Sequence, residues 1–357
     1  RRIFDPPAYR WVPFSGSRTG KERGLARRAF ASGHAQIAVG THALLEEGVE
    51  FARLGLAIID EQHRFGVLQR RALQQKGVSP DVLVMTATPI PRTLALTIYG
   101  DLDVSVIDEL PPGRKPIRTF HKTRDEIEQV YSFVKREVDA GRQAYIVYPS
   151  IDESEALAVK AAKRAYEELS RDVFPTLRTG LLHGKLKPAE KDAVMAAFLR
   201  NEIQILVATT VIEVGVDVPN ATVMVVENAE RFGMAQIHQL RGRVGRGADQ
   251  SYCILVTDRL NETGRERIRT LVESTDGFHI ANMDLKLRGP GEFLGTKQSG
   301  LPQFRIGNLL RDSELLELAR REAAAFVERP PSPEALAGAE RYIREHWQRR
   351  YGLALVG

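Results

Sequence analysis

The chain has 357 residues, of which 43% are hydrophobic and 27% charged, so it is long and apolar enough for two or three ordinary domains and is neither fibrous nor disordered. Its net charge of +5 suits a nucleic-acid partner but does not require one. The single cysteine lies in the apolar run "YCILV" and no apolar run is long enough to cross a membrane, so we expect a soluble, cytoplasmic chain without a membrane partner.

The first patterned stretch, "FSGSRTGKERG" (14–24), looks like a phosphate-binding loop because Gly20 is followed by Lys21. A P-loop needs a glycine five positions before Gly20 and a Ser or Thr after Lys21, whereas this chain has Ser15 and Glu22 there. A carboxylate at the second position would also repel phosphate. We therefore interpret the stretch as a loop of another kind. Because the sequence opens without an initiator Met and runs almost at once into a patterned fold, we expect it to begin inside a domain.

An internal repeat follows. Gly16–Thr41 aligns without gaps with Gly184–Thr209, at a constant offset of 168 residues (184 minus 16). Both copies read as a loop, an amphipathic helix and a β-rich strand. Chance similarity of two βα units is the alternative, but the flanking motifs also fall at equivalent places, which favours duplication.

The first copy continues with two apolar runs that predict buried parallel strands. The run 56–59 ends at Asp60 and Glu61, and the run 81–85 ends at Thr86-Ala87-Thr88, before a helix predicted from Thr93. Open α/β sheets bind ligands at the carboxyl ends of their strands, so this edge is a candidate site.

The proline-rich stretch 109–118 predicts a linker, and a second alternation of strands and helices follows it. The predicted strands are "IRTFH", "AYIVYP", "GLLHGKL", "IQILVATT", "TVMVVENA" and "SYCILV", with helices over 125–140 and 153–170. The fold class is therefore α/β, with doubly wound parallel sheets.

Three stretches carry candidate chemistry. Paired carboxylates such as Asp60 and Glu61 suit Mg²⁺-dependent phosphoryl transfer, although alone they are more often a strand-end ion pair. The stretch "QIHQLRGRVGRG" places Gln239, Arg241, Arg243 and Arg246 on a glycine-rich turn, where arginines can contact a γ-phosphate; a basic, solvated helix end is the alternative. In "TTVIEVGVDVPNA", Thr209 and Thr210 could donate to phosphates and Asp217 could contact a ribose, or the stretch could be a capped β-turn.

Together and in this order, these stretches resemble the superfamily-two helicases, whose motor is two RecA-like domains that close on ATP. The resemblance implies ATP and Mg²⁺ as cofactors, with Asp60 at the metal and Glu61 activating water. It implies γ-phosphate contacts by Gln239, Arg243 and Arg246. Further roles implied are nucleotide binding by Gly215 and Asp217 and coupling by Gln62, His63, Thr86 and Thr88.

Within that superfamily, the stretches "IDEQHRFGVLQR", "MTATPIPRTLALTIYGDLDVSVIDELPPGRKPI", "NAERFGMAQIHQLRGRVGRG" and 274–312 resemble the RecG family of DNA branch-migration translocases. The last stretch resembles that family's translocation motif, with helices at about 262–274 and 280–287 and then an arm that carries Arg288, Lys297 and Gln298. A purely structural hairpin is the alternative.

The resemblance also implies what the chain lacks, namely a wedge domain and a first motor segment with a true P-loop. We therefore expect the chain alone to be inactive in ATP hydrolysis. The loop at Ser15, Gly16 and Ser17 aligns with a DNA-backbone loop of the superfamily, and Lys185 takes the corresponding position in the second copy. Implied partners are branched double-stranded DNA and a single-stranded-DNA-binding protein, and the resemblance implies a monomer.

The expected domain organisation is a partial first RecA-like domain (1–108), a linker (109–118), a second RecA-like domain (119–257), a translocation hairpin and arm (258–305) and a helical tail (306–357). Two other functions are kept open: a transcription-repair coupling translocase, which shares the hairpin motif, and a non-catalytic DNA-binding module.

Overall fold

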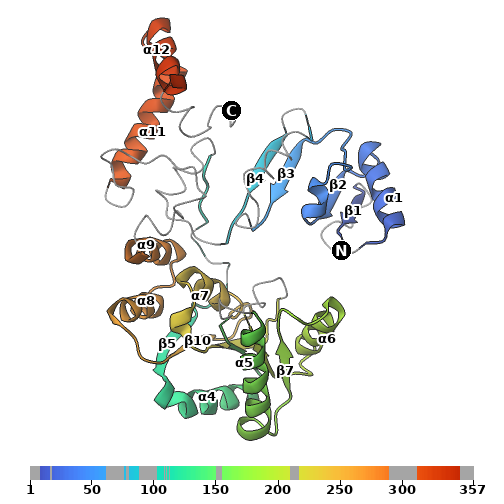
Figure 1. Cartoon of the computed structure of the whole chain (residues 1–357), viewed down its shortest axis with the longest axis vertical. Helices are drawn as coiled ribbons and strands as arrows, with labels where there is room; N and C mark the ends of the chain where they lie inside the picture. Colours follow the sequence, from blue (N-terminus) through green and yellow to red (C-terminus); the bar gives the residue numbers. More distant parts are fainter. Residues whose placement is uncertain are drawn as a thin grey trace. The chain divides into compact units, whose positions relative to one another are not determined.

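The computed structural model describes residues 9–16, 18–61, 76–77, 80–87, 103–107, 109, 111, 113–149, 155–209, 217–288 and 312–345. The chain divides into two compact units, Arg1–Thr88 and Pro89–Gly357, and each is described by itself (Figure 1).

The first unit begins with a small βαβ layer. It consists of β1 (Trp11–Phe14), α1 (Gly20–Ala31), β2 (Ile37–Gly40) and the short 3₁₀ helix η1 (His42–Leu45), and β1 pairs with β2 in parallel. Phe14 and Phe30 are almost completely buried and meet edge to face, with ring centroids 5.9 Å apart. This aromatic pair fixes α1 against the two strands.

The remaining strands of the first unit, β3 (Leu56–Ile59) and β4 (Asp81–Val84), form a second two-stranded parallel sheet. Among the described residues, β1–β2 and β3–β4 form two separate two-stranded sheets. The two faces of β3–β4 differ in burial: Ala57 and Ile59 are buried, whereas Leu56, Ile58 and Leu83 are about half exposed.

The second unit is built on a six-stranded sheet with the order β5-β10-β9-β6-β8-β7, in which every pair is parallel. The central strands are buried on both faces, as parallel sheets require. The strands are β5 (Arg118–Thr123), β6 (Gln143–Val147), β7 (Thr179–Leu182), β8 (Ile205–Ala208), β9 (Ala221–Val226) and β10 (Tyr252–Thr257). This confirms the α/β fold class.

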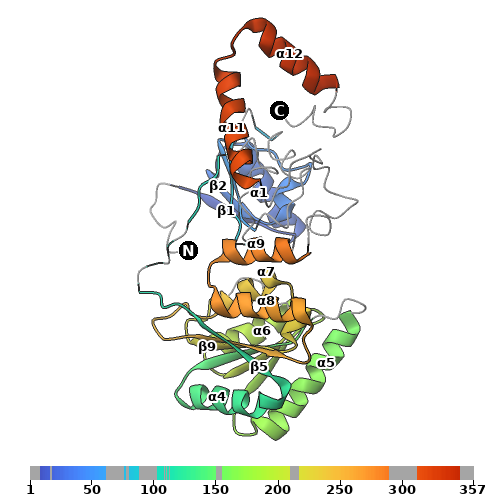
Figure 2. The same cartoon turned by 90° about the vertical axis from the view of Figure 1, so that its left-hand side faces the viewer.

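Helices cover both faces of this sheet, as Figure 2 shows for α4 on one face and α6, α7 and α8 on the other. In α4, Val130, Val134 and Val138 recur every four residues and are buried, which explains why this face of the helix packs on the sheet. The helices are α4 (Ile127–Asp139) after η3 (Arg124–Glu126), α5 (Glu155–Glu168) continuing into the π-helical turn η4 (Leu169–Val173), α6 (Pro188–Leu199), η6 (Ala229–Arg231), α7 (Met234–Arg241), α8 (Glu262–Glu273), α9 (Gly277–Arg288), α11 (Ser313–Glu328) and α12 (Pro333–Ile343). In the described part of the chain, no helix has both the length and the apolar character needed to cross a membrane.

The internal repeat is reproduced element by element. Adding 168 to the bounds of β1, α1 and β2 gives the bounds of β7, α6 and β8. Even a side-chain contact repeats: Gln36 Oε1 accepts from Arg10 N at 2.8 Å, and Gln204 Oε1 accepts from Arg178 N at 2.7 Å. The repeat is therefore structural, and it assigns each residue of one copy a counterpart in the other.

Candidate functional site

The carboxylates of the first unit lie at the carboxyl edge of the β3–β4 sheet. Asp60 and Glu61 follow β3 directly, and the hydrogen bond from Met85 N to Ile59 O (2.7 Å) keeps the segment leading to Thr86 alongside them. Glu61 has a φ of 53°, a left-handed conformation that is uncommon for a non-glycine residue, and its N–H donates to Asp60 Oδ1 at 2.8 Å.

The fit of Mg²⁺ to this edge follows from its donor chemistry. Asp60 is exposed at the strand end, and Mg²⁺ in phosphoryl-transfer sites is usually held by one or two carboxylates together with water and substrate phosphates. Among the described residues, no group of three or more His, Cys, Asp or Glu side chains forms a complete metal cage. Asp60 thus fits a hydrated Mg²⁺ brought by a nucleotide better than a structural metal.

The loop at Ser15 and Gly16 leads into the capped start of α1. The Glu22 carboxylate accepts from Thr19 N (3.0 Å) and from Thr19 Oγ1 (2.9 Å), and Thr19 Oγ1 in turn accepts from Glu22 N (3.4 Å). These hydrogen bonds lower the pKa of Glu22. The first turn of α1 is thus served by its own acidic cap, which supports the interpretation that Gly20-Lys21 is not a triphosphate loop.

In the second unit, Asp217 and Arg246 meet near the amino edge of the sheet. Asp217 precedes β9, Arg246 precedes β10, and Arg246 Nη1 forms an ion pair with Asp217 Oδ1. Gly247 permits this approach, because a Cβ atom there would lie 2.7 Å from the backbone oxygen of Pro219. The structure therefore brings together two residues that the sequence assigned to one nucleotide.

Further positive charge surrounds this pair. Arg114 Nε donates to the carbonyl oxygen of Gly245 at 2.9 Å, and burial together with the nearby Arg114 charge lowers the pKa of Arg246. Burial raises the pKa of Tyr145 to about 12, and the neighbouring charges of Arg243 and Arg246 oppose that rise. Arg114, Arg243 and Arg246 thus form a cationic cluster that can bind phosphate oxygens. Arg114 was not among the predicted site residues, because the prolines of "PPGRKPI" are typical of a linker.

Arg241 has a different role from the one its neighbours in "QLRGRVGRG" suggested. It is buried, and its Nη1 donates to Leu271 O (3.0 Å) and Ser274 O (2.8 Å), while its Nη2 approaches His238 Nδ1 at 2.8 Å. Arg241 therefore ties the end of α7 to the end of α8, and it is not available to a phosphate group. Because Arg241 and the exposed Arg246 belong to the same arginine-rich motif, the sequence alone did not show that their roles differ.

Other predicted residues lie at the opposite, carboxyl edge of the same sheet. Thr209 follows β8, and its N–H donates to Leu182 O at 3.1 Å, at the end of β7. The exposed Lys185 follows β7 at the same edge. Among the described residues of this unit, Thr209 and Lys185, assigned to DNA, thus lie at the edge opposite Asp217 and Arg246, assigned to the nucleotide.

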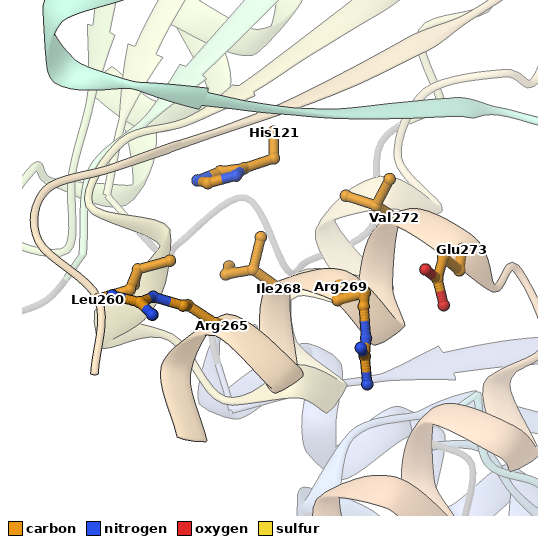
Figure 3. A pocket seen from close by; sticks show the side chains of 7 residues that line it. All are labelled: His121, Leu260, Arg265, Ile268, Arg269, Val272 and Glu273. Carbon is orange, nitrogen blue, oxygen red and sulfur yellow. The ribbon is translucent and has the colours of Figure 1, made fainter. Parts of the chain in front are cut away.

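A cavity of about 260 Å³ lies between β5 and α8 (Figure 3). Ile268 and Val272 give it an apolar wall, Arg265 and Arg269 add charge, and His121 lies across from α8. His121 Nε2 lies 2.7 Å from Thr257 Oγ1, and burial lowers the pKa of the imidazole. This cavity contains none of the residues that the sequence assigned to a site.

Several predicted site residues lie outside the described residues. Gln239, at the end of α7, is described and half buried, and Arg288 ends α9 with a side chain that is outside the description. The residues outside are Ser17, Gln62, His63, Thr88, Thr210, Gly215, Lys297 and Gln298.

Two family models match this chain. Residues 123–248 match the helicase conserved C-terminal domain, and residues 274–344 match the C-terminal part of domain 3 of the ATP-dependent DNA helicase RecG. The chain is 57% identical over 319 residues to ATP-dependent DNA helicase RecG of Synechocystis sp. (89% of this chain, 38% of that protein). It is 52% identical over 354 residues to the protein of that name from Escherichia coli (97% of this chain, 50% of that protein).

The chain belongs to the RecG family. It spans half or less of the length of these RecG relatives, 38% and 50%. The name of these relatives, ATP-dependent DNA helicase, indicates that the family uses a nucleotide. A solved structure of RecG bound to a three-way DNA junction is similar over 88% of this chain and 41% of that chain, with 49% identity and a TM-score of 0.68. Helicase Lhr of Mycobacterium smegmatis, at 18% identity and a TM-score of 0.55 over 77% of this chain and 38% of that one, shares the fold.

Proposed function

We propose that this chain is the motor part of an ATP-dependent double-stranded DNA translocase that remodels branched DNA, as in fork regression and branch migration. The observation that carries the proposal is the meeting of Asp217 and Arg246 beside Arg114, which gives a polar, cationic surface suited to a nucleotide. The RecG relatives support ATP and branched DNA as the ligands.

In this proposal the first unit supplies the hydrolytic carboxylates. Asp60 holds a hydrated Mg²⁺, and Glu61 orients the attacking water, for which its left-handed backbone and its hydrogen bond to Asp60 provide a fixed starting position. Bound Mg²⁺ and ATP supply the activated γ-phosphoryl group. Gln62, His63, Thr86 and Thr88 couple this edge to DNA.

The second unit supplies the charges that respond to the γ-phosphate. Arg243 and Arg246, with Gln239, stabilise the charge that develops in the transition state, and Gly215 and Asp217 contact the nucleotide. In the resting ion pair, Asp217 holds Arg246 in place. Phosphate oxygens can then compete for the same guanidinium group.

DNA is proposed to contact the carboxyl edges and the hairpin. In the first unit the contacts are Ser15, Gly16 and Ser17, and in the second unit they are Lys185, Thr209 and Thr210. Arg288, at the end of α9, and the later residues Lys297 and Gln298 are proposed as further DNA contacts. The hydrogen bonds from Arg241 to the carbonyl oxygens of Leu271 and Ser274 connect α7 to the hairpin. A shift of α7 would therefore be transmitted to α8.

The proposed organisation keeps a partial first motor domain (1–108), a linker (109–118), a second motor domain (119–257), the hairpin and arm (258–305) and a tail (306–357). A monomer, with a single-stranded-DNA-binding protein as an additional partner, is the proposed working form. The P-loop is expected to lie on another part of the intact protein, so this chain alone is proposed to lack ATP hydrolysis.

The test measures the binding of forked DNA and the Mg²⁺-dependent binding of a fluorescent ATP analogue, with and without that DNA, to this chain. ATP hydrolysis is measured in parallel for this chain and for the full-length protein. We expect DNA binding by the chain, little nucleotide binding, and DNA-stimulated hydrolysis only by the full-length protein. Ordinary DNA-stimulated hydrolysis by the chain alone would contradict the proposed division of labour. Displacement of a stalled RNA polymerase would favour a transcription-repair coupling translocase.

A further inference from the structure

His183 is the first residue after β7, beside Thr209, the first residue after β8. The register of the two strands pairs Leu182 with Ala208, and Thr209 N donates to Leu182 O at 3.1 Å. His183 and Thr209 are only 3% and 4% exposed. Two buried polar side chains therefore lie next to each other at the edge that carries Lys185.

The imidazole of His183 has an unused polar atom. Nδ1 is buried, and it has no hydrogen-bond partner among the described residues. Buried polar atoms in folded proteins are nearly always hydrogen-bonded, and an exception often marks a place filled by water, an ion or a ligand. A neutral imidazole can offer one N–H donor to such a group.

Lysines from two helices flank this histidine. Figure 1 shows β7 between α5 and α6, and Lys163 lies on α5 while Lys191 lies on α6. Burial lowers the pKa of His183 first, and the charges of Lys163 and Lys191 lower it further, whereas Glu190 acts in the opposite direction. The Glu190 carboxylate already accepts from Lys187 N at 2.8 Å, where it caps α6.

The lysines therefore give this cluster a positive charge, and burial together with the charges of Lys163 and Lys191 lowers the pKa of its histidine, which favours the neutral imidazole. Lys163 is exposed, Lys191 is partly exposed, and Lys185 is exposed on the adjoining loop. An anion placed between these ammonium groups would be neutralised by them and could accept from the imidazole. Phosphate, with oxygens in several directions, suits this arrangement better than a carboxylate.

We propose that Lys163, His183 and Lys191 form, together with Lys185, a binding site for one phosphodiester group of the DNA backbone. The proposal deepens the proposed function, on which it rests, and it extends the DNA surface from the loop after β7 onto helix α5. Lys163 lies outside every sequence motif predicted to contact DNA. His183 positions the group, and the three lysines supply the charge.

The test measures the affinity of this chain for a fluorescently labelled forked duplex over a series of salt concentrations. Replacing Lys163 with alanine should weaken binding several-fold and reduce the slope of log K against log salt by about 0.9, the value for one lost phosphate contact on duplex DNA. Lys135→Ala, an exposed lysine on α4, is the matched control and should change neither quantity.

His183→Phe should weaken DNA binding with a smaller change in salt slope, because a neutral donor is lost, and circular dichroism must show an unchanged fold. His183→Asn, which keeps a donor, should recover part of the affinity. If Lys163→Ala and Lys191→Ala both behave like the control while the parent chain binds DNA, this site is wrong and the proposed function stands. If the parent chain does not bind DNA, both fail. If the variants weaken binding of an ATP analogue and leave DNA affinity intact, the phosphate belongs to a nucleotide and the proposal is overturned.

Discussion

Arg241 Nη1 donates to the carbonyl oxygen of Ser274 at 2.8 Å, so the last residue of α7 is fastened to the turn between α8 and α9. A second bond, to Leu271 O at 3.0 Å, reaches the last turn of α8. One guanidinium group thus satisfies two carbonyl groups that helix geometry leaves without intrahelical partners.

Replacing Arg241 with alanine should destabilise the second unit. Both carbonyl groups would lose a charged donor, which should lower the free energy of unfolding by roughly 2–4 kcal/mol. Chemical denaturation followed by circular dichroism measures the change. Arg269→Ala, on the exposed side of α8, is the control and should stay within about 0.5 kcal/mol. Equal free energies of unfolding for the two variants would contradict the proposal that Arg241 links α7 to the hairpin.

His238 should make stability depend on pH. Burial, followed by the charge of Arg241, lowers the pKa of His238 to about 4, whereas an unfolded histidine titrates near 6.5. Between these values the unfolded chain binds more protons, so this contribution is complete above pH 6.5 and is lost as the pH falls toward 4. The loss should reach about 3 kcal/mol at pH 4.

His238→Gln should flatten that part of the curve when unfolding free energies are compared from pH 7 to pH 4.5. His279→Gln, an exposed histidine on α9, should retain the parental slope. A parental slope in the His238 variant would mean that other groups cause the pH dependence.

Arg246→Ala should act on catalysis in the full-length protein. An arginine that neutralises the transferring phosphoryl group is worth about 10³-fold or more in turnover, so kcat for DNA-stimulated ATP hydrolysis should fall by about that factor. KM for ATP should change much less. Steady-state hydrolysis measures both constants, with Arg259→Ala as an exposed control. A change confined to KM would indicate ground-state binding only.

Lys21→Ala should leave nucleotide binding unchanged, because the first turn of α1 is capped by Thr19 and Glu22. Thr19→Ala should instead lower the stability of the first unit by about 1 kcal/mol, the usual value of an N-cap. Fluorescent-nucleotide titration and thermal unfolding separate the two effects. Tighter nucleotide binding by the parent than by the Lys21 variant would restore the P-loop interpretation.

The sequence predicted many elements of both units well because they repeat or are strongly patterned. The run 56–59 coincides with β3, and the predicted helix over 262–274 coincides closely with α8 (Glu262–Glu273). The offset of 168 residues was visible in the letters and is present in the element bounds. Hydrophobic periodicity and the repeat can be read from the sequence itself, so they predict these elements without knowledge of the tertiary structure.

The sequence could not predict which side chains of a motif point into the core and which point toward a ligand. Arg241 and Arg246 belong to one short motif, yet one points into the core and the other meets Asp217. Arg114 and His183 gained their importance only from neighbours far along the chain. The roles assigned to Asp60, Glu61 and Arg243 are predictions.

The strand pair β3–β4 has a practical consequence for handling the protein. Leu56, Ile58 and Leu83 are about half exposed on one face of a short parallel ribbon, and exposed apolar side chains favour association with other copies of the chain. Purified at high concentration, the chain should form oligomers or aggregates, and dilution or the substitution Ile58→Lys should suppress them. Aggregation would then be a property of this ribbon rather than a sign that the six-stranded sheet has unfolded.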